Sequence, residues 1–387
     1  MNTDNPSLLL RLAVALIGLF AFLQVYSVQA ILPVLVQDLQ ASEVQAGLAV
    51  GATVLGVALI SPFMGMLSDA VGRKVFIVGS LLFLGVPTAL LAGVQSIEEM
   101  MLYRFLQGVA VPGISVVLIA YIGEEFENKA MTRLMSLYVT GTVLGGFLGR
   151  FMLGHLSESM GWRAAFYVMA ALSVLGALFV WKQLPASKKF VPKPHVQTAL
   201  RTLGGHLQNR YVVAACLLGG CLLFSLVGCF TYINLYLAAP PYALSSGSLA
   251  NLFAVYLIGM VITPLSARLI TRFGSAATML LALGLSMMGV AATLAESLTL
   301  IILALVLMSS GVFITQTATI SYIAANVKEG RSLASGLYYM AYYGGGTIGA
   351  WLCGLAYAQF GWTGVVCALL AVQVVAVLAV WKGMKAV

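Results

Sequence analysis

The chain has 387 residues, of which 61% are apolar and 8% are charged, and its formal net charge is +8. Soluble domains carry about 25% charged residues, so this composition excludes an ordinary soluble protein. The basic excess does not indicate nucleic-acid binding, because the Lys and Arg residues are distributed as topology signals between apolar runs.

Twelve apolar runs follow one another along the chain, and each is long enough for a helix that crosses about 30 Å of hydrocarbon. They cover about residues 12–36, 44–67, 75–96, 100–122, 134–155, 163–181, 211–238, 248–270, 276–295, 299–323, 333–357 and 362–381. We therefore predict an all-α membrane protein with twelve transmembrane helices. Its lipid partner is the bilayer itself.

The loops between these runs differ in charge. The even-numbered loops and both ends of the chain hold nearly all the Lys and Arg residues, whereas the odd-numbered loops carry acids and a single basic residue, Arg163. Because positive residues flanking spans stay on the cytoplasmic side, we predict that both termini and the even loops are cytoplasmic.

An internal repeat divides the chain. A shift of 200 residues lays Gly145 on Gly345 and Gly161-Trp162 on Gly361-Trp362, and a shift of 202 lays Gly72 on Gly274. This pattern predicts two six-helix bundles, 1–182 and 211–387, joined by a cytoplasmic linker, 183–210. The linker carries Val196, Leu200, Leu203 and Leu207 at helical spacing, which suits a helix on the membrane surface. It is either a tether or a regulatory element.

A charged turn follows the second apolar run. Its residues are Gly65-Met66-Leu67-Ser68-Asp69-Ala70-Val71-Gly72-Arg73-Lys74. Gly72 permits a left-handed backbone conformation, and one acid with two bases forms a charge cluster at headgroup level.

This turn resembles the signature loop between spans two and three of the major facilitator superfamily, G-x-L-x-D-x-x-G-R-K, and the resemblance extends over essentially the whole chain. It implies two pseudo-symmetric bundles around a central cavity and transport by alternating access. It also implies that Asp69 caps a helix of the other half and that Arg73 pairs with Glu124 or Glu125. We expect Gly65, Asp69, Gly72, Arg73, Lys74 and these two acids to form a conformational gate. The alternative is that the charges only set topology.

Two arginines lie within apolar runs, where a charge costs about 2.5–3.5 kcal/mol at mid-bilayer. Arg104, with Gln107 and Gly108, resembles the superfamily signature R-x-x-Q-G. Arg150 ends a glycine-rich stretch that resembles the antiporter signature, although Gly146 replaces its proline and Arg150 its last glycine. Both arginines are candidates for substrate binding or coupling. Snorkelling or pairing with a loop acid remains open for each.

Neutral polar residues complete the candidate site. The resemblance implies that spans one, four, seven and ten line the cavity, from which we favour Gln29, Gln107, Tyr232 and Gln316. Tyr338, Tyr339, Tyr342 and Tyr343 form two pairs at four-residue spacing, so one pair, Tyr339 and Tyr343, can face the cavity while the other packs. Packing is the alternative for each tyrosine.

These features predict a secondary transporter, not an enzyme. No ATP-binding loop or zinc motif is present in the sequence, and neither a cofactor nor a metal is expected. The absence of a mid-span carboxylate disfavours a specialist for cationic drugs. The resemblance favours a monomeric, proton-coupled exporter of small organic molecules in the bacterial inner membrane. The alternatives are uptake or facilitated diffusion of a small anionic metabolite, a lipid flippase, or a non-transporting sensor.

Overall fold

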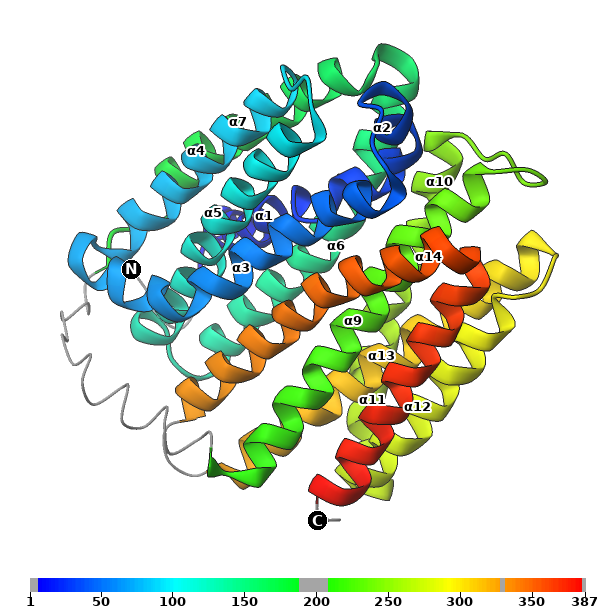
Figure 1. The fold of residues 1–387 in the computed structure, drawn as a ribbon. Helices are drawn as coiled ribbons and strands as arrows, with labels where there is room; N and C mark the ends of the chain where they lie inside the picture. Colours follow the sequence, from blue (N-terminus) through cyan, green and yellow to red (C-terminus); the bar gives the residue numbers. More distant parts are fainter. Residues whose placement is uncertain (1–5, 188–207, 328–330, 385–387) are drawn as a thin grey trace. The chain divides into compact units, whose positions relative to one another are not determined.

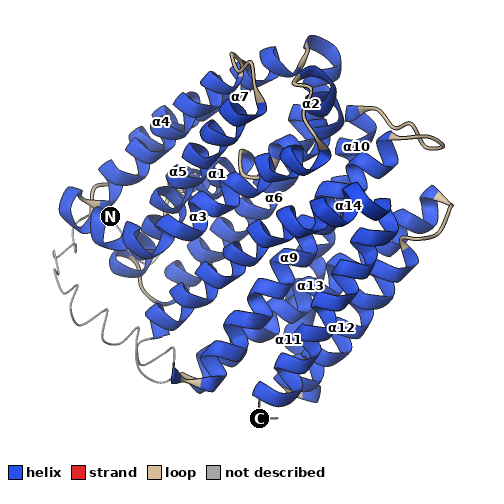
Figure 2. Cartoon of the chain, viewed as in Figure 1, coloured by secondary structure: helices blue, strands red, loops and turns tan. Residues whose placement is uncertain are grey.

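The computed structural model describes residues 6–187, 208–327 and 331–384, and throughout these ranges the regular structure is helical (Figure 2). The predicted surface helix of the linker lies outside the described residues. Ten described helices are long and apolar enough to cross a membrane, or up to eleven if one bent pair counts as a single span. The count of twelve spans stays a prediction.

The helices of the first half of the chain follow the predicted apolar runs (Figure 1). They are α1 (Leu8–Leu23), the 3-10 helix η1 (Ser27–Ile31), α2 (Leu32–Asp38), α3 (Glu43–Val71), α4 (Arg73–Leu91), α5 (Ile97–Glu125), α6 (Asn128–Met160) and α7 (Trp162–Gln183). The first apolar run is therefore broken. Its two parts, Leu8–Leu23 and Ser27–Asp38, meet at 45°.

The second half is built in the same way (Figure 1). It contains α9 (Arg210–Ala238), α10 (Ser246–Leu252), the 3-10 helix η2 (Phe253–Leu257), α11 (Ile258–Phe273), α12 (Ser275–Ala292), α13 (Leu298–Asn326) and α14 (Arg331–Gly383). The last two predicted runs are joined in α14, but Gly361 has φ 60° and ψ −151°, so two helices meet there.

Glycines with positive φ end helices at equivalent points of the two halves. Gly72 (φ 98°) separates α3 from α4 and Gly274 (φ 78°) separates α11 from α12. Gly161 (φ 81°) and Gly361 (φ 60°) occupy the other pair of turns. Glycine takes this conformation without the steric cost that a Cβ imposes. The glycines that recur in the sequence therefore mark turns that recur between helices in the two halves.

The described helices form two compact units. The first contains Met1–Val34, Ala52–Pro194 and Ser245–Asn251, and the second contains Leu35–Gly51, His195–Leu244 and Leu252–Val387. Each unit therefore includes one short segment from the other half of the sequence. In the first unit α1 packs on α6 and α4 packs on α5 and α7; in the second, α9 packs on α14 and α12 on α13.

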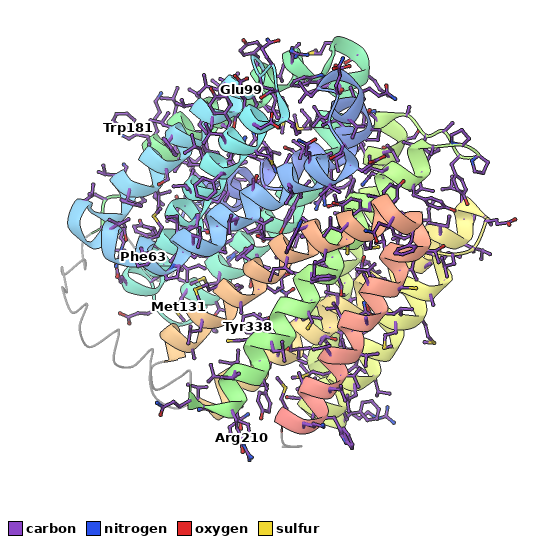
Figure 3. The ribbon with its side chains drawn as sticks, viewed as in Figure 1. Phe63, Glu99, Met131, Trp181, Arg210 and Tyr338 are labelled. Carbon is purple, nitrogen blue, oxygen red and sulfur yellow. The ribbon has the colours of Figure 1, made fainter. Side chains whose placement is uncertain are left out.

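Large apolar side chains cover the outside of both units. In the first unit Phe63 and Trp181 project from the helices (Figure 3), and Trp181 is 58% exposed. The second unit likewise exposes Leu281 and Leu303. Apolar surface of this extent is typical of a protein whose solvent is lipid.

Candidate functional site

The buried polar groups of the first unit gather at the break in the first span. α1 ends at Leu23 and η1 begins at Ser27, so the carbonyls of Gln24 and Val25 have no place in a continuous helix. Arg104 of α5 supplies their donors: its Nη1 donates to the Gln24 carbonyl at 2.6 Å, and its Nη2 donates to the Val25 carbonyl. The guanidinium is wholly buried. Snorkelling to the surface does not occur.

Gln107 extends this network by one helical turn. Its Oε1 accepts a hydrogen bond from Arg104 Nη1 at 2.7 Å, and its Nε2 donates to Thr88 Oγ1 on α4 at 2.8 Å. Thr88 in turn donates to the Leu84 carbonyl at 2.6 Å. The spacing of three residues puts Arg104 and Gln107 on the same face of α5, so the network joins α1, α4 and α5.

Gly108 has a separate, steric role. A Cβ added to Gly108 would overlap the Thr53 carbonyl oxygen of α3 and lie 3.1 Å from the Cα of Gly56. The backbones of α3 and α5 therefore meet at these two glycines. The R-x-x-Q-G pattern combines a buried cation, the amide that binds it, and the point where a neighbouring helix approaches closely.

Arg150 of α6 approaches the same break from the other side. Its Nε donates to Gln29 Oε1 at 2.8 Å, and its Nη1 donates to the Gly146 carbonyl at 2.6 Å. Its Cζ lies 4.7 Å from the centroid of the Tyr26 ring, within the range of a cation–π contact. Arg150 is 2% exposed, so this side chain also stays within the unit.

Tyr26 is a member of this site that was not among the favoured residues. It lies in the polar run of Gln24, Tyr26, Ser27 and Gln29 before Pro33, and the break of the first span brings its ring under Arg150. In a regular α-helix Tyr26 and Gln29, three residues apart, would share one face. Tyr26 instead lies in the break between α1 and η1, so this spacing does not predict its position. The sequence signal that could have identified Tyr26 was the density of polar residues in an apolar run.

Tyr232 and Gln316, the candidate residues of the second unit, do not join the polar network around the broken first span. Tyr232 is wholly buried, and its hydroxyl donates to the Ala350 carbonyl at 2.5 Å. Gly47 and Gly354 form the notch that holds this hydroxyl, because a Cβ on either would overlap it. Tyr232 therefore packs at a helix crossing, while Gln316 is half-buried on α13.

The four tyrosines of α14 divide into two pairs. Tyr338 and Tyr342 are buried, whereas Tyr339 is 38% exposed and stacks on half-buried Tyr343 with ring centroids 6.4 Å apart. Figure 3 labels Tyr338, whose ring fills the space left by Gly219 of α9. That Tyr339 and Tyr343 face a cavity stays a prediction.

The predicted gate residues come together in part. Arg73 binds Glu124 with two parallel hydrogen bonds, Nε to Oε2 at 3.1 Å and Nη2 to Oε1 at 2.7 Å, and its Nη1 donates to Ser68 Oγ. Glu124, rather than Glu125, is thus the partner. Gly72 makes the turn, and Lys74 and Glu125 are half-buried. Gly65 and Asp69 lie within α3, and the side chain of Asp69 is outside the described part of the chain.

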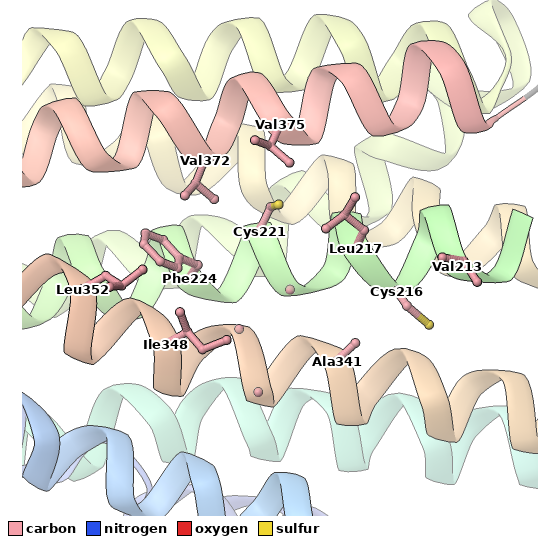
Figure 4. Close-up of a pocket in the computed structure, with 13 residues that line it drawn as sticks. Val213, Cys216, Leu217, Cys221, Phe224, Ala341, Ile348, Leu352, Val372 and Val375 are labelled. Carbon is pink, nitrogen blue, oxygen red and sulfur yellow. The ribbon is translucent and has the colours of Figure 1, made fainter. Parts of the chain in front are cut away.

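A separate groove lies in the second unit, between α9 and both helices of α14 (Figure 4). It measures about 560 Å³ and is lined by apolar side chains and two thiols, among them Leu217, Phe224, Ile348 and Val375. Leu217 and Ile348 are each 49% exposed. A groove without hydrogen-bonding side chains that opens on the apolar outer surface suits lipid chains better than a polar solute.

Known proteins similar to this chain include membrane transporters. The sequence model of the Major Facilitator Superfamily matches residues 14–329 and 241–385. The inner membrane transport protein YnfM of Escherichia coli is 32% identical over 93% of this chain and 87% of its own length. The chloramphenicol resistance protein CraA of Acinetobacter baumannii is 27% identical over 49% of this chain and 46% of its own.

A solved structure agrees in fold. The crystal structure of a mutant of the nucleoside transporter NupG aligns with a TM-score of 0.81 and covers 97% of this chain and 100% of its own, at 16% identity. At that identity the similarity concerns the fold alone. Together with the sequence matches, it assigns the chain to a family of membrane transport proteins.

Proposed function

Because the chain belongs to the major facilitator superfamily, whose members include transporters similar to it over nearly their whole length, we propose that it exports small organic molecules by alternating access. The proton gradient is the proposed driving force. The location is the bacterial inner membrane, with both termini in the cytoplasm.

The buried polar site around the broken first span carries this proposal. Arg104, Arg150, Gln29 and Gln107 are each at most 2% exposed within helices that otherwise bury apolar side chains. Placing a charge in a span costs about 2.5–3.5 kcal/mol at mid-bilayer. Polar groups of this kind inside a membrane bundle are typical of a solute pathway.

Two observations favour export of a small neutral or anionic molecule. The site holds two guanidiniums and several amides, and the segments that form it, 8–31, 100–122 and 134–155, contain no Asp or Glu. Such a site repels cations. A partial relative is named for resistance to chloramphenicol, and removal of a toxic compound from the cell is one way in which a transporter confers resistance.

Purified protein in liposomes provides the test, with chloramphenicol as the first probe and a pH-sensitive dye inside. We expect addition of the probe to move protons when the imposed gradient has either direction. Flux that is indifferent to the gradient would contradict proton coupling, and the absence of flux for a panel of small organic molecules would favour a sensor.

The matched variants are Arg150→Gln and Arg133→Gln. Arg150 lies in the buried site, whereas Arg133 is exposed on the same helix. We expect Arg150→Gln to lower probe-driven flux by roughly tenfold, equivalent to about 1.4 kcal/mol, and Arg133→Gln to leave it nearly unchanged. Equal flux in all three proteins would remove Arg150 from the transport site.

Transport of a small anionic metabolite is a second candidate, supported by the same pair of arginines. Arg150 lies over the Tyr26 ring and Arg104 donates to the carbonyl of the neighbouring Val25, so a carboxylate or phosphate entering here would meet two positive charges. Proteoliposomes loaded with small carboxylates distinguish the candidates. Counterflow of a carboxylate without proton movement would favour this alternative over proton-coupled export.

A further inference from the structure

The apolar groove of the second unit is about as long as one leaflet of a bilayer is thick. On α9 its lining extends from Val213 to Phe224, and on the first helix of α14 from Ala341 to Leu352 (Figure 4). Either stretch rises by about 16 Å, since each residue of a helix adds 1.5 Å. Half of a hydrocarbon core is about 15 Å thick. An extended acyl chain of one leaflet therefore matches the groove in length.

The internal repeat shows which part of the first unit corresponds to the groove. A Cβ on Gly145 would overlap the carbonyl oxygen of Leu19, and a Cβ on Gly345 would overlap that of Gly220. These equivalent contacts relate α6 to α14 by a shift of 200 residues and α1 to α9 by a shift of 201. The same shifts relate the next contacts along the helices, Gly149 with Leu23 and Gly349 with Phe224.

Smaller side chains account for the groove in the second unit. By these shifts, three groove residues correspond to larger residues of the first half: Gly220 to Leu19, Cys221 to Phe20 and Gly344 to Leu144. In the first unit the Phe20 ring lies against α7, where a Cβ on Gly176 would overlap it. In the second unit a Cβ on Gly344 would meet no atom within 4 Å. Because packed helices leave few voids, the space that side chains leave here is open to lipid chains.

Two exposed cations lie on the faces of the helices that line the groove. Arg210 precedes Val213 on α9 by three residues, and Lys382 follows Val375 on α14 by seven. Residues at these spacings share one face of a helix. Neither α9 nor α14 contains an Asp or Glu residue. The groove faces thus continue into positive charge at one end, and the same two helices offer no acid to neutralise it.

The two cations lie at the same end of the groove because the ends of their helices touch. A Cβ on Gly383, the neighbour of Lys382, would lie 2.5 Å from the Cβ of Ala214. Arg210 Nη2 donates to the Tyr211 hydroxyl at 2.8 Å, and its Cζ lies 4.8 Å from the centroid of that ring. The tyrosine therefore holds the guanidinium at the end of α9. An anionic headgroup at this end would meet two positive charges while its acyl chain enters the groove.

We propose that the groove binds an anionic phospholipid of the cytoplasmic leaflet. One acyl chain lies between α9 and the two helices of α14, and the headgroup phosphate lies at Arg210 and Lys382. The inference does not depend on the export proposal. It rests on the predicted orientation, which puts this end of both helices on the cytoplasmic side, where anionic lipids attract basic residues. The acyl chain takes the place that Phe20 and its neighbours fill in the first unit.

Native mass spectrometry of the purified, full-length protein tests the headgroup preference. Dioleoylphosphatidylglycerol is the anionic probe, and dioleoylphosphatidylcholine, which has the same acyl chains and no net charge, is its comparison. We expect the first phosphatidylglycerol to bind about tenfold more tightly than the first phosphatidylcholine, since each basic residue adds attraction for an anionic headgroup. Equal affinity for the two lipids would overturn the proposal.

A matched pair of leucine variants tests the groove itself. Gly344→Leu fills it with the residue that the first half has at the equivalent position. Gly284→Leu makes the same change on α12, at a half-buried glycine where an added Cβ also meets no atom within 4 Å and which does not line the groove. We expect Gly344→Leu to weaken phosphatidylglycerol binding by about tenfold, because buried methylene groups of the lipid are displaced. Gly284→Leu should stay within about twofold. Equal binding by both variants would contradict the proposal.

A charge variant tests the headgroup end without altering the packing of the groove. With Arg210→Gln and Lys382→Gln combined, the protein should bind phosphatidylglycerol as weakly as phosphatidylcholine. The control combines Arg268→Gln with Arg272→Gln, two exposed arginines of α11, and should keep the preference. Retention of the preference in the first variant, or its loss in the control, would show that these two cations do not bind the headgroup. The same spectra record oligomers, and a dimer that Gly344→Leu dissociates would assign the groove to a second copy of the chain instead.

Discussion

At the scale of single residues, the two membrane-level arginines have different surroundings. Arg104 directs its described hydrogen bonds to the carbonyls of Gln24 and Val25 and to the Gln107 amide. These are the acceptors that a broken helix leaves over, so Arg104 holds the break of the first span in place. Arg150 donates to one carbonyl of its own helix, that of Gly146, and otherwise contacts the side chains of Gln29 and Tyr26, which can rearrange around a solute.

We predict that Arg104→Met lowers the free energy of unfolding by about 2 kcal/mol or more. Three acceptors lose a charged donor, and each hydrogen bond to a charged group contributes about 1.5–3 kcal/mol. Unfolding by SDS in mixed micelles measures the change. The control, Arg133→Met on the exposed face of α6, should stay within about 0.5 kcal/mol, and an equally stable Arg104→Met would show that the carbonyls find other donors.

At the scale of elements, small residues decide which helices touch. A Cβ on Gly141, Gly145 or Gly149 of α6 would overlap the carbonyl oxygen of Ala15, Leu19 or Leu23 of α1 respectively. The three glycines of α6 and the three residues they contact on α1 each recur every four residues, so one face of α6 stays in contact with one face of α1 over about two turns. In lipid, helices associate through such close packing rather than through a hydrophobic force. The sequence showed the glycines, and the structure identifies α1 as their partner.

Two adjacent glycines test this packing. We predict that Gly145→Ala destabilises the protein by about 1–3 kcal/mol, since an added methyl group must displace the backbone of α1. Gly146→Ala places its Cβ 3.6 Å from Arg150 Nη1, an ordinary contact, and should be neutral or slightly stabilising because alanine favours helix. Thermal unfolding in detergent compares them; similar losses for both variants would contradict the α1–α6 contact.

At the scale of the whole molecule, the internal duplication accounts for the turns that recur in both halves but not for the arginines, which only one half contains within its spans. The turns at Gly72 and Gly161 recur in the second half at Gly274 and Gly361. The membrane-level arginines do not: a shift of 200 residues lays Arg150 on Ala350, whose carbonyl accepts the Tyr232 hydroxyl. One half thus holds the cationic site, while the other has apolar Ala350 at the position equivalent to Arg150.

The predicted orientation can be checked with two exposed positions. We expect Ser159→Cys, in an odd-numbered loop, to react with an impermeant maleimide added to intact cells. Thr271→Cys, in an even-numbered loop, should react only after permeabilisation, because the flanking Arg268 and Arg272 keep that loop inside. The unsubstituted protein, whose five cysteines lie within the predicted spans, gives the background. The reverse pattern would invert the topology.

The sequence by itself determined the class, the duplication and the family of this protein. Apolar content, span length and repeated glycines are properties of the chain that need no knowledge of which helices meet, and the loop signature from Gly65 to Lys74 indicated the family that the comparisons show. The same reasoning located Arg104 and Arg150 as the charged residues inside spans.

Only the tertiary structure decided what these residues bind. The partners of Arg104 are main-chain carbonyls, which have no sequence signature, and they became available because the first span breaks between Leu23 and Ser27. Glu124 rather than its neighbour Glu125 binds Arg73 because successive residues on a helix point in different directions. The inclusion of Leu35–Gly51 in the second unit and of Ser245–Asn251 in the first was equally invisible, since it depends on contacts between segments far apart in the chain.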